Sequence, residues 1–339
     1  MNSKLLSVAV LCGMCFSATA FAGPTLDKIR ARGELVCGVN TSAPGFAAAN
    51  SQGKWEGLDV NLCRGVAAAI LGDADKVKYV PLSSTQHMTA LGSGEIDMLA
   101  RNTSWTMTRD ASQGAAFVVV SYYDGQGFMV PKALGVKSIN ELDGATVCVQ
   151  TGTTTEKTTA DYFNSHKMQY KTVVFDTTEA TQSAFISGRC DVYTSDLSDL
   201  AGVRTVAPDP SKFEILPETI TKEPLGPAVR RGDWEFFEIV RWCFQAFVGA
   251  EEYGVTQANV DEVRKTATDP NVKRLVGTGE DMGRMLGLDK DWSYRLIKQV
   301  GNYGESWEKY FGPNSALNLP RGLNKLYKDG GLMYALPIR

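Results

Sequence analysis

Three short polar segments carry side chains suited to binding a small charged molecule. The first is residues 102–109, which read Asn-Thr-Ser-Trp-Thr-Met-Thr-Arg and combine hydroxyl groups with one guanidinium. Arg109 can present two parallel N–H donors to a carboxylate, an arrangement that lysine cannot make. The alternative interpretation is a solvated arginine at a helix start, paired with Asp110 or another surface acid. Arg109 is therefore a candidate for binding a carboxylate.

The second segment, residues 150–156, reads Gln-Thr-Gly-Thr-Thr-Thr-Glu and joins a strand-like run to a helix. Unpaired amides at a helix N-terminus attract anions, and Gly152 permits close approach to the backbone. The segment lacks the Gly-Lys-Ser/Thr of a phosphate-binding loop and the Gly-x-Gly-x-x-Gly of a dinucleotide site. It predicts a site for a small anionic group. The alternative is a threonine-rich cap, with Thr153 and Glu156 at capping-box spacing, that serves only its own helix.

The third segment, residues 191–196, ends a strand-like run with the carboxylate of Asp196. That carboxylate can bind an ammonium group, or it can be only the N-cap of a helix that begins at Leu197. Together the three segments offer a guanidinium, an anion-accepting helix start and a carboxylate. This combination matches the two charges of an α-amino acid zwitterion, so we predict a site for such a molecule.

Two aromatic residues lie close to these segments in the sequence or in the predicted sheet. Phe46, in Thr-Ser-Ala-Pro-Gly-Phe, and Trp105 can cover the side chain of a ligand. Large aromatic side chains are also the usual material of a core. They define specificity only if the fold leaves them exposed.

The elements that position these segments alternate between short β-branched runs and amphipathic helices, the pattern of parallel sheets with helical crossovers. Strands are predicted at residues 35–39, 77–82 and 96–100, with an apolar helical stripe over residues 58–70. Open α/β sheets bind ligands at the carboxyl ends of their strands. The predicted fold class is therefore α/β, and residues 102–109 follow one of its strands.

A second cycle of strands and helices begins near Gly127, so two lobes are more economical than one long sheet. The strand-breaking segments 122–127 and 223–229 are expected to cross between the lobes, and two crossings form a hinge. We expect a first lobe at residues 23–126 and a second lobe at 127–222. Residues 223–339 are expected to return to the first lobe and to add a helical C-terminal extension.

The first 22 residues have the features of a secretory signal peptide. Lys4 precedes the apolar run 5–16, and Ala20-Phe21-Ala22 is a small-x-small cleavage site. No later run reaches the roughly 18 uninterrupted apolar residues of a membrane span. The sequence therefore predicts a soluble exported protein.

Five cysteines follow this segment, and in an oxidising compartment some of them can pair. Cys148 and Cys190 lie in or beside strand-like runs that neighbouring parallel strands can bring together. Cys37, in a strand, and Cys63, on the following helix, form the other plausible pair, which leaves Cys243 free. The alternative is that all five are small core residues.

Charge and histidine content exclude several function classes. The chain has 35 basic and 38 acidic side chains and a net charge of −3, which favours neither nucleic acid nor an anionic membrane as a partner. Its two histidines, His87 and His166, exclude histidine-rich zinc sites and HExxH metalloproteases. No metal and no cofactor are predicted.

Several segments resemble the periplasmic solute-binding proteins of ABC importers, in the polar-amino-acid cluster. They cover about residues 26 to 255 in order, and the segments that carry the resemblance are 35–40, 53–62, 93–98, 106–109, 151–154 and 188–196. The tail, including residues 301–304 and 330–334, is similar to the longer general L-amino-acid-binding subgroup. The resemblance implies a periplasmic, type II two-lobed clamshell, monomeric and without cofactor, that captures free L-amino acids and hands them to permease subunits in the inner membrane.

The resemblance also implies roles for individual residues. Arg109 would hold the α-carboxylate with the backbone amides of Ser104 and Thr154, and Thr153 belongs to the same segment. Asp196 would take the α-ammonium, assisted by the Asn102 carbonyl and the Ser104 hydroxyl. Ala43 stands where family members often have an aromatic clamp, which Phe46 or Trp105 would replace. Arg101 would favour a polar or acidic ligand side chain, or face solvent.

Two other functions are compatible with the same fold. Exported dehydratases use this clamshell, and an enzyme would need an acid or base at the substrate, for which Asp196, Glu156 and His166 are the candidates. No nucleophile–base pair is evident, however. The second alternative is an amino-acid sensor, which would need a separate signalling partner.

Overall fold

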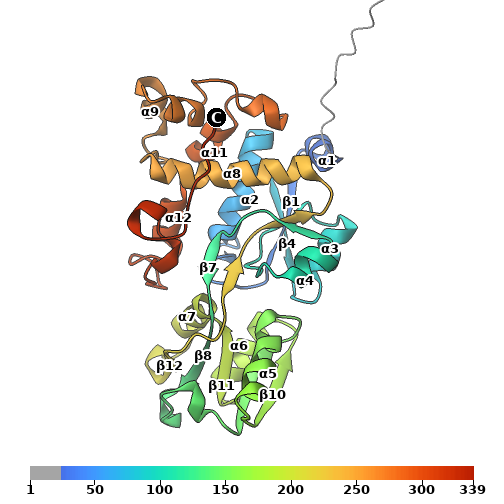
Figure 1. Ribbon diagram of the computed structural model, residues 1–339, viewed down its shortest axis with the longest axis vertical. Coiled ribbons are helices and arrows are strands. Elements are labelled where there is room, and N and C mark those ends of the chain that lie inside the picture. The colour runs from blue at the N-terminus through green and yellow to red at the C-terminus, as the bar shows by residue number, and fades with distance from the viewer. Residues whose placement is uncertain (1–23) are drawn as a thin grey trace, which may run out of the picture.

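Two five-stranded sheets, each covered by helices, form the two lobes of the molecule (Figure 1). The computed structural model describes residues 24–339. The predicted signal peptide, residues 1–22, lies outside the described residues. Within residues 24–339, no helix is both long enough and apolar enough to cross a membrane.

The sheet of the first lobe takes strands from two separate stretches of the chain, one before and one after the second lobe. Its spatial order is β4 (Val77–Leu82), β1 (Leu35–Asn40), β5 (Met98–Leu99), β14 (Ala228–Arg230) and β6 (Ala115–Phe117). Strand β1 runs parallel to β4 and β5, whereas β14 is antiparallel to both of its neighbours. All six residues of β1 are buried, as expected for a central strand covered on both faces.

Helices and a short hairpin complete the first lobe. They are α1 (Pro24–Arg32), the hairpin β2 (Ala48–Ala49) and β3 (Trp55–Glu56), α2 (Leu58–Leu71), α3 (His87–Ser93), α4 (Met107–Ser112) and α8 (Trp234–Glu252). The predicted apolar stripe over residues 58–70 becomes α2, and Gly72 ends it in the left-handed conformation that glycine adopts without strain. The predicted strand at 96–100 is confirmed, although only its centre forms ladder pairs.

The second lobe is built from one continuous stretch of chain. Its spatial order is β10 (Tyr170–Phe175), β9 (Ala145–Gln150), β11 (Val192–Asp196), β8 (Gln126–Pro131) and β12 (Phe213–Ile215). Strands β9, β10 and β11 are parallel, whereas β8 and β12 are antiparallel additions. Helices α5 (Thr154–Ser165), α6 (Thr178–Ile186) and α7 (Leu197–Val206) cover this sheet.

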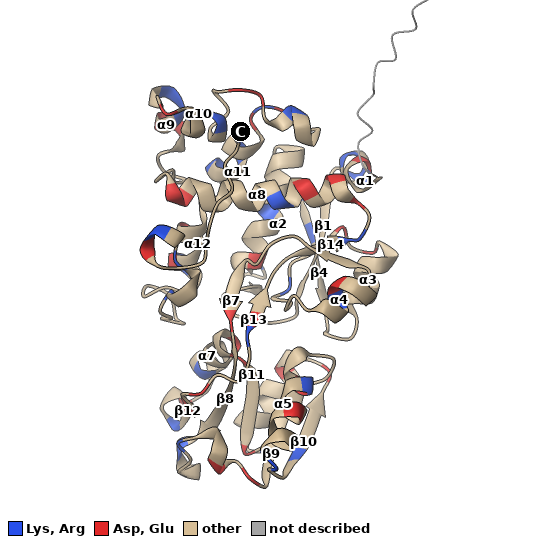
Figure 2. Cartoon of the chain, in the orientation of Figure 1, with Lys and Arg blue, Asp and Glu red and all other residues tan. Residues whose placement is uncertain are grey.

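Two strands connect the lobes and pair with each other. β7 (Tyr122–Asp124) leaves the first lobe and β13 (Glu223–Leu225) returns to it, in an antiparallel pair that runs between the two sheets (Figure 2). Both lie in the segments expected to cross. A two-stranded connection of this kind is a hinge about which two lobes can close.

The C-terminal extension packs on the first lobe and on the connecting strand. Its helices are α9 (Val260–Thr266), α10 (Pro270–Leu275), α11 (Trp292–Val300) and α12 (Tyr303–Tyr310). Trp292, Trp307 and Tyr303 are buried against α2 and α8. Asn324 then binds Tyr123 of β7 twice, accepting from its amide at 2.7 Å and donating to its carbonyl at 3.1 Å. The tail therefore holds the first-lobe end of the hinge.

One disulfide lies in each lobe. Cys37 of β1 pairs with Cys63 of α2, Cys148 of β9 pairs with Cys190, and Cys243 is a buried free thiol. Both predicted pairs are therefore confirmed, and the interpretation of all five cysteines as unpaired core residues is wrong. Cys190 reaches Cys148 because β11 runs parallel to β9 directly after it.

Candidate functional site

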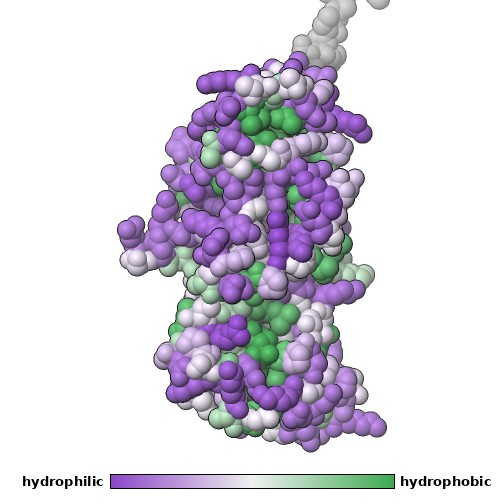
Figure 3. Space-filling view, turned by 90° about the vertical axis from the view of Figure 1, so that its left-hand side faces the viewer, coloured by the Kyte–Doolittle hydropathy of each residue, from purple (hydrophilic) through white to green (hydrophobic). Residues whose placement is uncertain are grey.

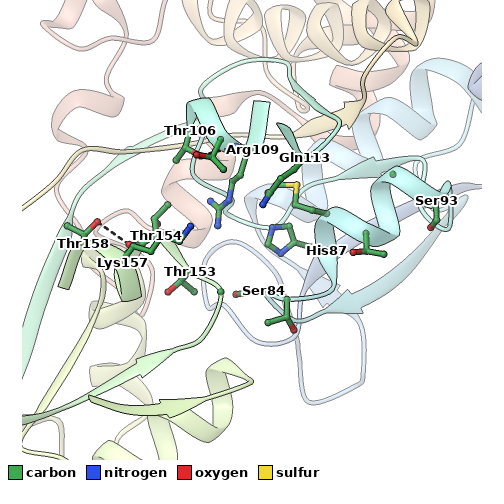
Figure 4. Close-up of a pocket in the computed structure, with 16 residues that line it drawn as sticks. Ser84, His87, Ser93, Thr106, Arg109, Gln113, Thr153, Thr154, Lys157 and Thr158 are labelled. Carbon is green, nitrogen blue, oxygen red and sulfur yellow. Dashed lines mark hydrogen bonds between the residues drawn. The ribbon is translucent and has the colours of Figure 1, made fainter. Parts of the chain in front are cut away.

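Two adjacent cavities lie between the lobes, and residues from both lobes line each of them. The inner pocket, of about 40 Å³, is bordered by Asn102, Ser104, Arg109, Thr153, Thr154 and Asp196 together with nine further residues. The outer chamber, of about 840 Å³, lies between α3 and α4 on one side and the start of α5 on the other (Figure 4). Ser84, Arg109, Thr153 and Thr154 border both.

The loop after β5 places the first-lobe groups. Asn102 adopts a left-handed conformation, φ 40°, which asparagine tolerates better than most residues. Its amide donates to Asp59 Oδ2 at 2.6 Å. Ser104 forms an isolated antiparallel bridge with Leu225 of β13, flanked by bonds on either side. In such a pair the Ser104 amide points away from Leu225, and it donates to no other described residue.

Arg109 lies in the first turn of α4, with Thr106 as the N-cap whose hydroxyl accepts from the Arg109 amide at 3.3 Å. Its Nη1 donates to the Ser104 carbonyl at 2.9 Å, which directs the guanidinium toward both cavities. Burial lowers the pKa of Arg109, and the charges of Glu223 and Asp196 oppose that shift. Arg109 forms no ion pair with Asp110 in the described structure, so the solvated-pair interpretation is wrong.

The start of α5 supplies the helix N-terminus on the second lobe. Thr153 is its N-cap and accepts from the Glu156 amide at 3.1 Å. The Glu156 carboxylate accepts from the Gly152 amide at 2.8 Å rather than from Thr153, so the predicted capping box forms one residue out of register. The amide of Thr154, the first helical residue, has no partner among the described residues and faces the cavities.

Asp196 ends β11 and borders the inner pocket. Its side chain is only 8% exposed, yet its carboxylate accepts no hydrogen bond from any described residue. It occupies the N-cap position of α7 without making a cap bond, so the purely local interpretation is wrong. Burial raises its pKa well above the usual range, reinforced by the charges of Asp124, Glu223 and Asp199 and opposed by that of Arg109.

The acidic residues near Asp196 accept hydrogen bonds from described residues, whereas Asp196 accepts none. Asp124 accepts from the Ser198 hydroxyl and amide and from the Gly125 amide at 2.8 Å, and burial raises its pKa to about 6. Asp199 accepts from the Tyr193 hydroxyl at 2.6 Å. A buried, unpaired carboxylate among other acids is unfavourable unless a cation joins it.

Arg101 and His87 also border the cavities, and sequence reasoning gave a role only to Arg101. Arg101 is buried, donates to the Leu82 carbonyl and to Ser84 Oγ at 2.9 Å each, and borders the inner pocket, so it does not face solvent. His87 borders the outer chamber, and burial lowers its pKa to about 3, reinforced by the charges of Arg101 and Arg109. Of the two alternatives for Arg101, a position facing solvent is therefore wrong and a contact with the ligand side chain stays a prediction. No local pattern in the sequence indicated a role for His87.

The two aromatic residues lie outside both cavities. Phe46 is 1% exposed and packs edge-on against Tyr122 and Phe311, at 5.0 and 4.9 Å between ring centroids. Trp105 stacks on Phe117 at 5.6 Å. The prediction that Phe46 covers the ligand is wrong, because Tyr122 of β7 and Phe311 of the C-terminal extension bury its ring. Trp105 is half-buried and lines neither cavity, and its contact with a ligand stays a prediction.

Direct contacts join the two lobes across the cavities. Ser104 Oγ lies 3.3 Å from Thr154 Oγ1, and Thr41 Oγ1 donates to Glu179 Oε2 at 3.0 Å. These contacts bring the carboxylate-binding and ammonium-binding candidates to one enclosed space. No group of three metal-ligating side chains is arranged to hold an ion anywhere in residues 24–339.

Known proteins of similar sequence show which family of proteins this chain belongs to. The General L-amino acid-binding periplasmic protein AapJ of Rhizobium johnstonii is 50% identical over all of both chains. The Glutamate/glutamine/aspartate/asparagine-binding protein BztA of Rhodobacter capsulatus is 51% identical over 95% of each. Both names describe binding proteins, so this chain is a binding protein and the dehydratase alternative is set aside.

A solved structure matches both lobes and the extension. The periplasmic binding protein of an ABC transporter from Brucella ovis, with glutathione bound, superposes with a TM-score of 0.90 at 51% identity, over 93% of this chain and 99% of its own. The predicted type II periplasmic-binding-protein fold is thereby confirmed. The sequence model of the bacterial extracellular solute-binding proteins, family 3, matches residues 35–259, and this chain belongs to that family.

Proposed function

We propose that this chain captures free L-amino acids of broad range in the periplasm and delivers them to the permease subunits of an ABC transporter. The observation that carries the proposal is Asp196, a buried carboxylate without a hydrogen-bond donor that shares one small pocket with Arg109. An α-amino acid brings the ammonium that Asp196 lacks and the carboxylate that Arg109 can bind.

In this proposal the α-ammonium and α-carboxylate of the ligand, together called its head group, fill the inner pocket. Arg109 binds the α-carboxylate with the amides of Ser104 and Thr154, and Thr153 holds the helix start in place. Asp196 binds the α-ammonium, with the Asn102 carbonyl and the Ser104 hydroxyl as further acceptors. All five of these residues, Asn102, Ser104, Arg109, Thr154 and Asp196, border that pocket.

Closure follows from the placement of these groups on two lobes. Arg109 and Ser104 belong to the first lobe, whereas Thr154 and Asp196 belong to the second. A ligand held from both sides stabilises the closed form relative to the open form, and only that difference can drive the hinge. The closed shape is the signal that the permease subunits receive.

The names of the relatives support the ligand class and the compartment. AapJ is named for L-amino acids in general, and BztA for two acidic residues and their amides. We propose that residues 1–22 direct export and are cleaved, and that the mature protein acts as a monomer with the lobe boundaries predicted above.

Replacement of Arg109 tests the proposal. We expect Arg109→Ala to lower the affinity for every amino acid that binds by at least about 100-fold, because it leaves a carboxylate unpaired. Arg109→Lys should recover only part of this loss, since lysine cannot form the planar pair of bonds. Arg204→Ala, on α7 outside both cavities, is the matched control. Isothermal titration calorimetry against twenty L-amino acids measures the effect, and near-native affinity of Arg109→Ala would refute the placement.

A further inference from the structure

Glu223 lies where the hinge meets the inner pocket. It is the first residue of β13, opposite Asp124 of β7, and it is 3% exposed. Its carboxylate accepts from two hydroxyl groups, Thr221 Oγ1 at 2.9 Å and Thr154 Oγ1 at 3.1 Å. Thr154 is the first residue of α5 and borders the inner pocket. Glu223 therefore joins the hinge to the helix start of the second lobe.

A chain of hydrogen bonds continues from Glu223 to the first lobe. Thr154 Oγ1 lies 3.3 Å from Ser104 Oγ, a contact in which either hydroxyl can donate. A hydroxyl group has one proton, however, and an ionised carboxylate only accepts. The Thr154 proton is used in the bond to Glu223, so the bond between the two hydroxyl groups forms only if Ser104 donates. The chain therefore runs in one direction, from Ser104 through Thr154 to Glu223.

This direction decides what Ser104 offers to a ligand. Its hydroxyl proton is used in the bond to Thr154, and Ser104 Oγ makes no other hydrogen bond to a described residue. Only its lone pairs remain for the inner pocket, which Ser104 borders. An ammonium group has three N–H donors and no acceptor. It matches the three acceptors of the proposed site, which are the Asp196 carboxylate, the Asn102 carbonyl and Ser104 Oγ.

We propose that Glu223 is a positioning residue for amino-acid binding, which sets the direction of this chain and thereby makes Ser104 an acceptor for the α-ammonium. This proposal rests on the proposed function, since the ammonium occupies the inner pocket there. Ser104 belongs to the first lobe, Thr154 to the second and Glu223 to the hinge. The chain is complete only when the lobes meet. Closure and recognition of the ammonium therefore depend on the same hydrogen bonds.

Substitutions along the chain, each made with and without Ser104→Ala, test this role. Thr154→Val removes the middle hydroxyl but keeps the shape of the side chain and the backbone amide, whereas Thr154→Ser keeps the hydroxyl. Glu223→Leu removes the final acceptor. Thr205→Val is the matched control, because the Thr205 hydroxyl also makes one hydrogen bond, at 2.7 Å to the Gly202 carbonyl, and borders neither cavity. Isothermal titration calorimetry with L-glutamine gives the affinities, and thermal unfolding shows which variants are folded.

We expect Thr154→Val to lower L-glutamine affinity about fivefold, within the range for a neutral hydrogen bond, because the Ser104 proton is then free to turn into the pocket. Thr154→Ser and Thr205→Val should stay within about twofold of the wild type, as substitutions that leave this chain intact. In the Ser104→Ala background, Thr154→Val should have almost no further effect.

Glu223→Leu removes a charge as well as an acceptor. The charge acts on the ammonium in both backgrounds, whereas the hydrogen-bond chain acts only where Ser104 is present. We therefore expect the loss of affinity caused by Glu223→Leu to be at least about threefold smaller in the Ser104→Ala background, as for residues of one hydrogen-bond network.

Each other outcome overturns the assignment or the function on which it rests. Native affinity of Thr154→Val, or equal losses with and without Ser104→Ala, refutes the chain. Equal losses from Glu223→Leu in the two backgrounds refute the role of Glu223. If Glu223→Leu does not fold, Thr154→Val decides, since it interrupts the same chain and keeps the carboxylate. Binding of no amino acid by the wild type refutes the proposed function itself.

Discussion

The inner pocket and the outer chamber share Arg109 but differ in charge, burial and size. The pocket is small and contains Asp196 close to Asp124, Asp199 and Glu223. The chamber is some twenty times larger, is lined by hydroxyl groups and two cations, and contains no acid. The first can recognise only a fixed head group, whereas the second can accept side chains of many shapes.

This difference explains how one site can be specific for the α-ammonium and α-carboxylate and still accept many side chains. In the inner pocket, a ligand that lacks a matching charge leaves a buried protein charge unpaired, and its affinity is much lower. In the outer chamber, a change of ligand side chain costs little affinity, because water can bond to the exposed hydroxyl groups instead. Figure 3 shows the side of the molecule that is on the left in Figure 1, where most residues are hydrophilic and apolar patches lie near the level at which the lobes meet.

Removing the charge of Asp196 should give the largest loss of amino-acid affinity, and it tests the inner pocket alone. We expect Asp196→Asn to lower amino-acid affinity by about 100-fold or more, because the ligand ammonium would be buried without a counter-charge. The same change should stabilise the ligand-free protein by about 1–3 kcal/mol, since an unpaired buried carboxylate is removed. Calorimetry and urea unfolding measure the two effects.

The opposite signs of these effects separate a binding role from a structural one. Asp196 makes no cap bond in α7, so its replacement removes no local interaction. Asp161→Asn, on the exposed face of α5, is the control and should change neither quantity. Loss of both affinity and stability in Asp196→Asn would show that Asp196 supports the fold instead.

Acidification should give a smaller effect, through the buried carboxyl groups in and around the inner pocket. Burial raises the pKa of Asp196 well above its usual range and that of Asp124 to about 6. A carboxyl whose pKa is higher in the folded state stabilises that state at low pH and loses this contribution as the pH rises through the folded pKa. The ligand-free protein should therefore lose stability between about pH 4 and the folded pKa values.

Amino-acid affinity should change in the opposite direction over the same range, because only ionised Asp196 attracts the ammonium. We expect the affinity for L-glutamine to fall by up to about tenfold per pH unit on acidification below the pKa of Asp196. Titrations from pH 5 to 8 measure it, with Asp196→Asn as the comparison. A pH dependence equally strong in Asp196→Asn would assign it to other groups.

The three chemical segments could be predicted from the sequence because each follows a strand and begins a helix. Arg109, Thr153 and Asp196 meet because the carboxyl ends of parallel strands lie at one edge of each sheet, and the hinge brings the two edges together. The Cys148–Cys190 pair followed from the same strand order, and the Cys37–Cys63 pair from a strand and the helix after it. Composition and spacing therefore predicted which strand end of which lobe carries each of these three residues.

The roles of Phe46 and His87 could not be predicted, because each depends on contacts distant in sequence. Phe46 is core only because Phe311 of the C-terminal extension packs on it, 265 positions farther along the chain. His87 lines the chamber because α3 faces α5 across the lobes, an arrangement that no local pattern encodes. The types of individual residues indicated where the α-ammonium and α-carboxylate bind. The outer chamber could be seen only in the folded structure, because it lies between the two lobes.

Removing the Ser104 hydroxyl should give the smallest loss of amino-acid affinity. It tests the contact between the lobes at the boundary of the pocket. Ser104 Oγ lies 3.3 Å from Thr154 Oγ1 across the pocket, so Ser104→Ala removes this contact and one proposed acceptor of the α-ammonium, and leaves Arg109 and Asp196 in place. We expect about a tenfold loss of L-glutamine affinity, the lower end of the range for a hydrogen bond to a charged group. Ser112→Ala, an exposed hydroxyl of α4 that donates to the Thr108 carbonyl, is the control. A loss as large as that of Asp196→Asn would mean that closure, rather than charge, sets the affinity, because the hydroxyl pair contributes only when the two lobes meet.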